Sequence, residues 1–590
     1  MTLFVERRRP VFTTELSLRV ILAWAMIAAL LLVTNLPSIL AHRFPDPDDA
    51  LRLIQVRDFL AGQGWFDLAQ HRAGDTPMHW SRLVDLPIAG VILLLRGLIG
   101  TPAAELAAMI VVPMLTLLVC LLLIGRIAWR VMGDEIAFFA CLTFAFCVPV
   151  IEQLRPMRID HHGWQIAMVL LALNGLMARS ARAGGWVVGT ALAVQLSISI
   201  EGLPLAAAIM AVLAWRWIRV RGDRQWLISA MHALAAGSAA LYVLAHGFAP
   251  SLPLCDTITP VHLAIFAWGA LVVTVCSALE PQPRATLLAG FAVAGGGALF
   301  IVSQAASQCM TGAFAGIDPL ARTMWLERIS EGLPIWHQSL PVMLQIVLPP
   351  AIAIVATIRL AGRASGWLRI WWIEYAVILI AAFAISIMVG RAGAVAGALA
   401  AIPLGWQLRE WLRGVRHLKR PLKRAMVYGG VALALVPAAP ALLLVSAAPG
   451  QAKLARALPL TVSDEQCAVS SPPLTLAQLP KGRVLAPLDV APQVLVNTPH
   501  VVLATGHHRA AKLPDVIRAF IAAPAESRAL LLRERIDYIA LCPAVAEPKN
   551  YAHDAPGGLA AALLAGKAPA WLAPVPAQQG DGWMVWRVLR

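Results

Sequence analysis

The chain has 590 residues, of which 59% are hydrophobic and only 14% are charged. This composition excludes a large soluble domain and is typical of a protein that crosses the membrane many times. The net charge of +15 can indicate a nucleic-acid partner, but the basic residues stand in short loops between apolar runs. That distribution is the positive-inside signature of a membrane protein, so we expect membrane lipids around the chain and no nucleic acid.

Thirteen apolar runs are read as membrane spans. Arg7, Arg8 and Arg9 precede the first run, which predicts a cytoplasmic N-terminus and a retained helix, because no small-residue cleavage site follows. Residues 86–99 form a shorter run, expected as a helix in the outer interface. The spans are expected at about 17–40, 104–125, 135–150, 163–178, 184–200, 203–215, 227–248, 260–279, 285–303, 341–358, 371–389, 393–407 and 425–446.

The sequence changes character after residue 446. Short β-rich runs alternate there with helical patterns, which predicts a small α/β domain at 447–590 behind a transmembrane domain at 1–446. Thirteen spans place this domain on the outer side, together with two outer loops at 42–103 and 304–340. The expected location is a bacterial inner membrane with a periplasmic α/β domain. The β-rich runs are 483–488, 500–505, 538–542 and 584–589, and the helical patterns are 513–521, 525–535 and 559–564.

Four of the eight cysteines fall in outer segments, where an oxidising compartment permits disulfides. Cys467 and Cys542 lie in the predicted α/β domain and are the favoured pair. Cys255 and Cys309 lie in outer loops, and their pairing is left open. The remaining four fall in spans and are expected to be packing residues.

Acidic, histidine and arginine side chains collect at the outer turns of this topology. Closely spaced carboxylates repel one another unless a cation or a proton relieves them. Carboxylates beside an imidazole suit Mg²⁺ or Mn²⁺, and an arginine at the membrane face suits a phosphate. These groups come from four separate turns: Asp46, Asp48 and Asp49; Asp160, His161 and His162; Glu331; and Arg391.

The same turns resemble, in their order, the motifs of a known family. The run 48–62 followed by 79–85 looks like the first external loop of the catalytic subunit of oligosaccharyltransferases, which are integral-membrane GT-C glycosyltransferases. Asp160-His161-His162 resembles the family's second motif in its Asp-x-His form. The run 328–331 is similar to the short motif that ends in glutamate, and Gly390-Arg391 matches the arginine that contacts the lipid-linked phosphate. The resemblance implies thirteen spans and an outer C-terminal domain.

The resemblance also implies a donor sugar carried on a polyprenyl phosphate or pyrophosphate. Asp48, Asp160 and His162 are then expected to hold Mn²⁺ or Mg²⁺, and Arg391 to hold the lipid phosphate. A carboxylate, either Asp48, Asp49 or Glu331, is expected to orient or deprotonate the acceptor hydroxyl. Attack opposite the leaving phosphate predicts inversion at the anomeric carbon.

One motif of the family is not kept. Where the family has Trp-Trp-Asp-Tyr-Gly, this chain has Leu-Ala-Pro-Leu-Asp-Val-Ala-Pro at 485–492, so Asp489 can stand at the aspartate position but both tryptophans are absent. We therefore expect a glycan or lipid hydroxyl as acceptor, with an oligosaccharyltransferase acting on protein as the alternative. The expected acceptor or sugar contacts are His79, Trp80, His161, Asp489, His507 and His508.

Two further interpretations belong to other classes of protein. A transporter places ionisable groups near the bilayer midplane and often has internal repeats, whereas here the acids stand at outer turns and no repeat is visible. A non-catalytic scaffold that binds lipid-linked glycan would lose the metal-binding acids, which are present here. The tryptophans at 65, 80, 325 and 336 suit either sugar stacking or the aromatic belt of the interface.

Overall fold

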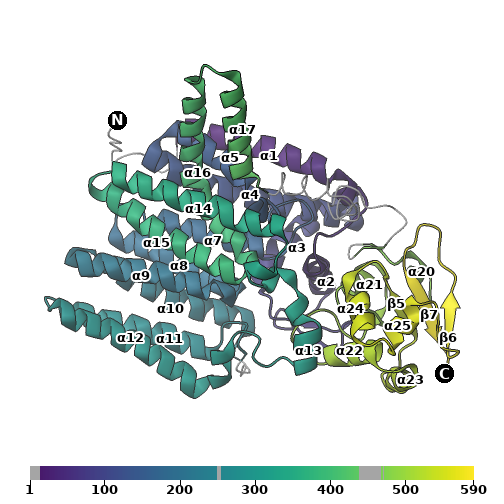
Figure 1. The fold of residues 1–590 in the computed structure, drawn as a ribbon. Helices are drawn as coiled ribbons and strands as arrows, with labels where there is room; N and C mark the ends of the chain where they lie inside the picture. Colours follow the sequence, from purple (N-terminus) through teal and green to yellow (C-terminus); the bar gives the residue numbers. More distant parts are fainter. Residues whose placement is uncertain (1–12, 249–253, 438–466, 469–470) are drawn as a thin grey trace.

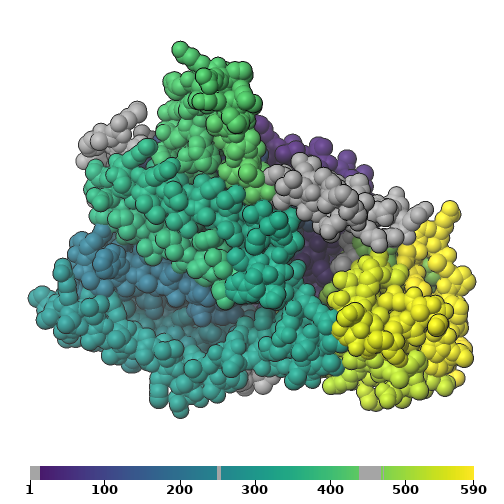
Figure 2. Space-filling model, viewed as in Figure 1, coloured from purple at the N-terminus to yellow at the C-terminus, as the bar shows by residue number. Residues whose placement is uncertain are grey.

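The computed structural model describes residues 13–248, 254–437, 467–468 and 471–590. Figure 1 shows a bundle of long helices and, beside it, a smaller body in yellow that carries a β-sheet. Helices α2 (Pro47–Leu60) and α13 (Pro319–Met324) lie between the two, although they come from distant parts of the sequence. The space-filling view in Figure 2 shows the teal segment around α13 against the yellow body, so the long outer loop reaches the sheet-bearing part.

Each predicted span contains a helix within the described residues. Apolar runs form helices here because a helix satisfies its own backbone polar groups, which lipid cannot do. The predicted last span, 425–446, extends past residue 437 and so lies partly outside the described residues. The helices are α1 (Thr14–Leu40), α4 (Thr101–Met132), α5 (Asp134–Phe146), α7 (His162–Gly175), α8 (Ala181–Ile198), α9 (Leu203–Arg219), α10 (Arg224–His246), α11 (Pro260–Ala278), α12 (Arg284–Ala305), α14 (Leu340–Arg363), α15 (Gly366–Met388), α16 (Gly393–Arg416) and α17 (Pro421–Leu435).

Among the described residues, eight helices are long and apolar enough to cross a membrane by length and composition. This confirms a polytopic membrane protein, while the number of thirteen crossings and their orientation stay predictions. Short helices connect the long ones: α6 (Val148–Ile151), η1 (Ile200–Gly202), η2 (Arg221–Asp223), η3 (Ser307–Thr311), η4 (Leu326–Arg328), η5 (Ser330–Gly332), η6 (Ile335–His337) and η7 (Gly390–Ala392).

The first outer loop is ordered by its own helices. It contains α2, a hairpin of β1 (Ala69–Gln70) with β2 (Thr76–Pro77), and α3 (Arg82–Ile99). On α3, Ile88 and Ile92 are buried while Leu94 and Leu98 are exposed. The two apolar faces fit a helix that packs on protein on one side and faces lipid on the other, as expected for the run 86–99.

The C-terminal part forms a five-stranded mixed sheet with strand order β4-β3-β5-β7-β6. The central strand β5 (Tyr538–Leu541) pairs parallel with β3 (Arg483–Leu485) and antiparallel with β7 (Met584–Val588). β4 (Val501–Val502) and β6 (Leu572–Val575) form the edges. The associated helices are α20 (Leu474–Ala477), α21 (Ala491–Asn497), α22 (Leu513–Ile521), α23 (Pro524–Arg533), α24 (Ala546–Asp554) and α25 (Leu559–Leu564). The predicted runs correspond to β3, β4, β5, β7, α22, α23 and α25, whereas β6, α20, α21 and α24 were not predicted.

The outer loops and the sheet share their apolar cores. One buried cluster joins Leu51 and Ile54 of α2 to Val484 of β3 and Val494 of α21, and another joins Trp325 to Leu488. Backbone groups reinforce the junction, because Val502 N–H donates to Arg72 O at 2.9 Å and extends the edge of the sheet. Both loops therefore pack against the sheet-bearing part, and the first loop bridges the edge strand β4 at Ala73 and Val502.

Two disulfides form in the outer segments, Cys467–Cys542 and Cys255–Cys309. The first is the pair that the sequence favours, and the second resolves the pair that the sequence leaves open. Cys120, Cys141, Cys147 and Cys276 are free and buried, as expected for packing residues.

Candidate active site

The N-terminus of α2 presents three acidic side chains to the junction. Asp46 is the N-cap, its carboxylate accepts from Asp48 N–H at 3.0 Å, and Pro47 occupies the first helical position. This is the usual sequence of a helix start, in which an acidic side chain satisfies a free backbone N–H and complements the positive end of the helix dipole. Asp48 and Asp49 follow in the first turn, so both are fixed at the helix end.

Asp49 ties α2 to the segment before α7. Its Oδ1 accepts from the backbone N–H groups of Ile159 at 2.8 Å and Asp160 at 2.9 Å, and its Oδ2 pairs with Arg158 Nη1 at 3.1 Å. The side chain is fully buried. Both carboxylate oxygens are thus engaged, which is the arrangement of a residue that positions its neighbours.

Two buried arginines partly neutralise the acids. Arg158 Nη1 also pairs with Asp46 Oδ2 at 3.1 Å. Arg52, on the inner side of α2, pairs with Asp85 at 3.0 Å and lies 3.5 Å from Asp160 Oδ1. Sequence reasoning did not assign either arginine, although Arg158 stands only two positions before Asp160 in the acidic motif.

Asp160, His161 and His162 form a compact group of possible metal ligands. Each offers one ligand atom, and these atoms lie within 4.8 Å of one another. Asp160 Oδ1 contacts His161 Nδ1 at 2.6 Å, and Oδ2 lies 3.4 Å from His162 Nε2. Asp160 Oδ2 is buried and has no hydrogen-bond partner. A buried carboxylate oxygen without a partner is costly, and a divalent cation bound to it relieves that cost.

Asp48 lies outside this group of three but close enough to interact with it. Burial, followed by the charges of Asp46, Asp160 and Glu331, raises the pKa of Asp48 well above its usual value. Burial, Asp46 and Asp160 also raise the pKa of Glu331, against the opposing effect of Arg391. The predicted acids from three turns therefore share one electrostatic environment that binds protons or a cation.

Arg391 lies in η7, directly before α16, and faces the acids. It pairs with Glu331 Oε1 at 3.4 Å and with Glu201, which lies just before α9. Burial opposes its charge, but Glu201, Glu331 and Asp48 outweigh burial and raise its pKa. An arginine held between two carboxylates can present part of its guanidinium to a phosphate. Glu201 was not assigned from the sequence.

Asp489 occupies the sheet side of the site. Trp325 Nε1 of the long outer loop donates to Asp489 Oδ1 at 3.1 Å, and Glu547 accepts from the backbone N–H groups of Leu488 and Asp489 at 2.7 and 2.9 Å. Burial raises the pKa of Asp489, the Trp325 hydrogen bond lowers it, and the charge of Asp46 raises it. Asp489 is therefore within electrostatic reach of α2, and an indole from another segment lies beside it.

The other expected contact residues separate into two groups. Trp80 lies under Arg52, with the guanidinium 4.2 Å from its ring centre, and is buried rather than open to a sugar. The rings of His507 and His508 both contact the His79 ring, and the His507 ring also contacts the Trp80 ring. His161 remains with Asp160. The sequence placed all of these as acceptor or sugar contacts, which stays a prediction.

No family model and no curated protein matches the chain by sequence. Its structure is similar to solved structures of the oligosaccharyltransferase AglB from Archaeoglobus fulgidus. The form tethered to an acceptor peptide containing the NVT sequon matches with a TM-score of 0.64 and 14% identity, over 95% of this chain and 73% of that one. The complex with an inhibitory peptide and dolichol-phosphate matches with a TM-score of 0.59 and 14% identity, over 88% of this chain and 69% of that one. The complex with Zn and sulfate matches with a TM-score of 0.59 and 13% identity, over 89% of this chain and 67% of that one. These likenesses show that the chain has the oligosaccharyltransferase-like GT-C fold.

Proposed function

We propose that this protein is a metal-dependent, inverting glycosyltransferase that moves a sugar or oligosaccharide from a polyprenyl phosphate or pyrophosphate to an acceptor hydroxyl. The observation that carries the proposal is the convergence of Asp48, Asp160, Glu331 and Arg391 from four segments of a GT-C fold. The reaction would take place on the periplasmic side of a bacterial inner membrane. The similar structure of AglB, in complex with an inhibitory peptide and a dolichol-phosphate, supports a lipid-linked donor.

We assign the divalent cation, Mn²⁺ or Mg²⁺, to Asp48, Asp160 and His162. Asp160 Oδ2, which accepts no hydrogen bond, the imidazole 3.4 Å from it and the raised pKa of Asp48 fit a cation site. When bound, the cation would neutralise charge that develops on the leaving phosphate. His161 also belongs to the compact group and competes with Asp48 for the third ligand position.

The chain's own residues carry the remaining steps. Arg391 holds the lipid phosphate and is itself oriented by Glu201 and Glu331. Asp48 or Glu331 accepts the proton of the acceptor hydroxyl, for which a raised carboxyl pKa is suited. Asp49 positions the segment at 158–160 through its three hydrogen bonds, so among the three predicted catalytic acids it is the one we assign to positioning.

The acceptor is proposed to be a glycan or lipid hydroxyl. Asp489 Oδ1 is already bonded to Trp325, which leaves Oδ2 for an acceptor, and the family's paired tryptophans are absent. A protein acceptor is the alternative, because the Archaeoglobus fulgidus oligosaccharyltransferase tethered to a peptide with the NVT sequon has a similar fold.

The experiment follows donor consumption by the purified full chain in nanodiscs with Mn²⁺ or with EDTA. Wild type is compared with Asp160→Asn and with Asp75→Asn, an exposed aspartate of the first outer loop, 42–103. We expect EDTA and Asp160→Asn each to reduce turnover by at least about a hundredfold, while Asp75→Asn stays at the wild-type rate. A glycan hydroxyl and a sequon peptide, supplied separately, decide the acceptor.

Two outcomes contradict the proposal. Donor binding without turnover, unchanged by Asp160→Asn, indicates a scaffold that binds lipid-linked glycan. No donor binding indicates another class such as a transporter. The buried Arg216–Glu374 pair between α9 and α15, at 2.9 Å, is the ionisable pair that a transporter test would then address.

A further inference from the structure

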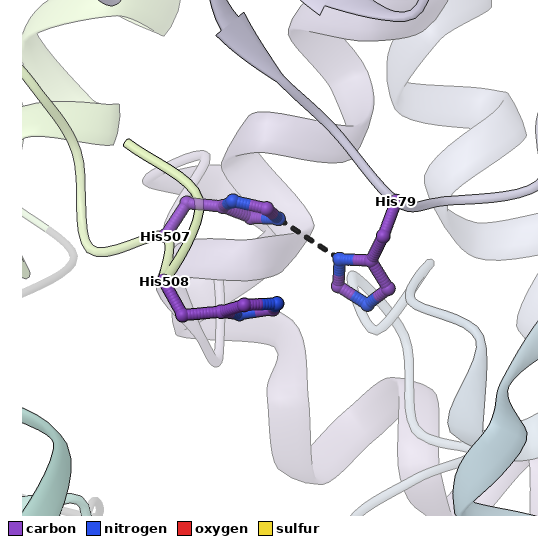
Figure 3. Close-up of side chains that lie close together, drawn as sticks. All are labelled: His79, His507 and His508. Atoms are coloured by element: carbon purple, nitrogen blue, oxygen red, sulfur yellow. Dashed lines mark hydrogen bonds between the residues drawn. The ribbon is translucent and has the colours of Figure 1, made fainter. Parts of the chain in front are cut away.

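Three histidines from distant segments meet at the junction between the first outer loop and the sheet. His79 follows β2, and His507 and His508 follow β4. One ring nitrogen of each lies within 4.8 Å of the other two. Figure 3 shows the rings of His507 and His508 side by side, both facing His79.

The spacing of the rings suits a tetrahedral metal ion. His79 Nδ1 and His507 Nε2 are 2.9 Å apart. Two imidazole nitrogens on one tetrahedral Zn²⁺ are about 3.3 Å apart, given metal–nitrogen bonds of about 2.0–2.1 Å. The two nitrogens therefore need to move apart only slightly for both to bind one ion. Binding through Nε2 moves the His507 proton to Nδ1 and releases the 3.3 Å contact from Arg509 N–H.

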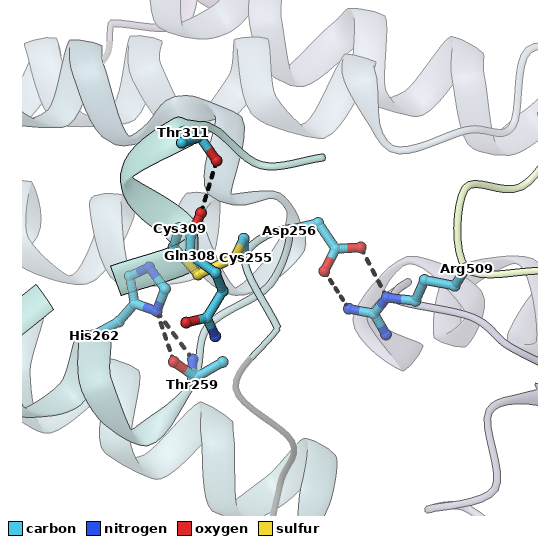
Figure 4. The surroundings of a disulfide bond; sticks show 8 residues. All are labelled: Cys255, Asp256, Thr259, His262, Gln308, Cys309, Thr311 and Arg509. Carbon is cyan, nitrogen blue, oxygen red and sulfur yellow. Dashed lines mark hydrogen bonds and ion pairs between the residues drawn. A yellow bond between two sulfur atoms is a disulfide. The ribbon is translucent and has the colours of Figure 1, made fainter. Parts of the chain in front are cut away.

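A carboxylate orients the third histidine. Asp256 pairs with His508 Nε2, which leaves Nδ1 of His508 as the nitrogen free to bind an ion. Asp256 is itself fixed by Arg509, with contacts of 2.6 and 2.8 Å, and by the adjacent Cys255–Cys309 disulfide (Figure 4). A carboxylate behind a ligating histidine sets its tautomer and orientation in metal sites. The Phe314 ring lies 4.9 Å from the His508 ring and restricts water on that side.

We propose that His79, His507 and His508 form a second metal site for a divalent transition-metal ion, with Zn²⁺ as the expected ion and water in the fourth position. Three imidazoles favour zinc over the oxygen-preferring Mg²⁺. This site is separate from the group at Asp160 and does not depend on the proposed transferase reaction. Its role is to join the outer loop to the sheet, which also fixes Trp80 beneath Arg52.

The test uses Co²⁺ as a spectroscopic probe in the full chain, after removal of metal with a chelator. All proteins carry Asp160→Asn, so that the other possible metal group does not contribute. We expect one equivalent of Co²⁺ with the visible absorption of a tetrahedral site, which Zn²⁺ displaces. His79→Gln should abolish the signal, and Asp256→Asn should weaken affinity about tenfold to a hundredfold.

The matched control is His553→Gln, whose side chain is 88% exposed. It should bind Co²⁺ like the parent. Thermal unfolding provides an independent readout, since Zn²⁺ should raise the Tm of the parent and not that of His79→Gln. An unchanged tetrahedral spectrum in His79→Gln, or no stoichiometric Co²⁺ binding by the parent, overturns the proposal.

Discussion

Two substitutions of Asp49 test whether this residue positions the segment at 158–160 or takes part in the reaction itself. Asp49→Ala leaves two buried backbone N–H groups, at Ile159 and Asp160, without an acceptor. Each such loss costs about 1–3 kcal/mol, so we expect about 2–6 kcal/mol of destabilisation. Asp49→Asn keeps the Oδ1 that accepts both bonds but places an NH2 donor where Oδ2 accepted from Arg158, so the ion pair and its hydrogen bond are lost, while Arg158 retains Asp46 at 3.1 Å. We expect about 1–3 kcal/mol for that change.

The assay is thermal unfolding of the purified chain in nanodiscs, combined with donor turnover. Asp49→Asn should have a Tm between those of wild type and Asp49→Ala and should keep measurable turnover, whereas Asp48→Asn should lose turnover with a near wild-type Tm. Asp75→Ala controls for the loss of an acidic residue from the same loop. If Asp49→Asn unfolds like wild type but loses turnover as fully as Asp48→Asn, the positioning role is refuted.

Three further predictions test other parts of the junction. Arg391→Ala should raise the KM for the lipid-linked donor about tenfold to a hundredfold in steady-state assays, because a hydrogen-bonded charge on the phosphate contributes about 1.5–3 kcal/mol; an unchanged KM would place the phosphate elsewhere. The affinity for Mn²⁺, measured by titration calorimetry, should weaken as the pH falls. Burial and like charges raise the pKa values of Asp48 and Glu331, so protons compete with the ion. An affinity that does not change with pH would contradict this. Cys255→Ser with Cys309→Ser should lower the Tm, since closing the 54-residue separation is worth about 4 kcal/mol by chain entropy, and an unchanged Tm would show that the loop is held without the disulfide.

The sequence predicts the fold well where one physical signal dominates. Apolar runs bounded by basic loops predicted the position of a helix for each expected span. The prediction works because a backbone in lipid must satisfy its own polar groups, which a continuous helix does. The edge strand β6 was missed since its sequence, Leu-Ala-Pro-Val, contains Pro574, which is tolerated at a sheet edge but weakens the strand pattern. The short helix α21 was missed because residues 491–496 are all buried, so it has no polar face to mark it, and α24 because only Glu547, Pro548 and Tyr551 of its nine residues are buried.

The candidate site was predicted in outline for a different reason. Its acids and Arg391 fall in segments between the predicted spans, and the prediction that these segments share one side of the membrane grouped them. The counter-charges were not predicted, because Arg158 and Arg52 act through partners more than 100 positions away, at Asp49 and Asp160. Whether a carboxylate is free or fully engaged, as Asp49 is, depends on backbone N–H groups that no residue pattern specifies.

The sheet-bearing part contributes residues to the candidate site. Glu547 holds the turn at Leu488 and Asp489, and Trp325 of the long outer loop bonds to the Asp489 side chain. Trp325 is only 6% exposed, so the loop that carries it cannot leave the sheet without exposing a large apolar ring. A hydrogen bond and burial thus together hold the segment around Trp325 on the sheet.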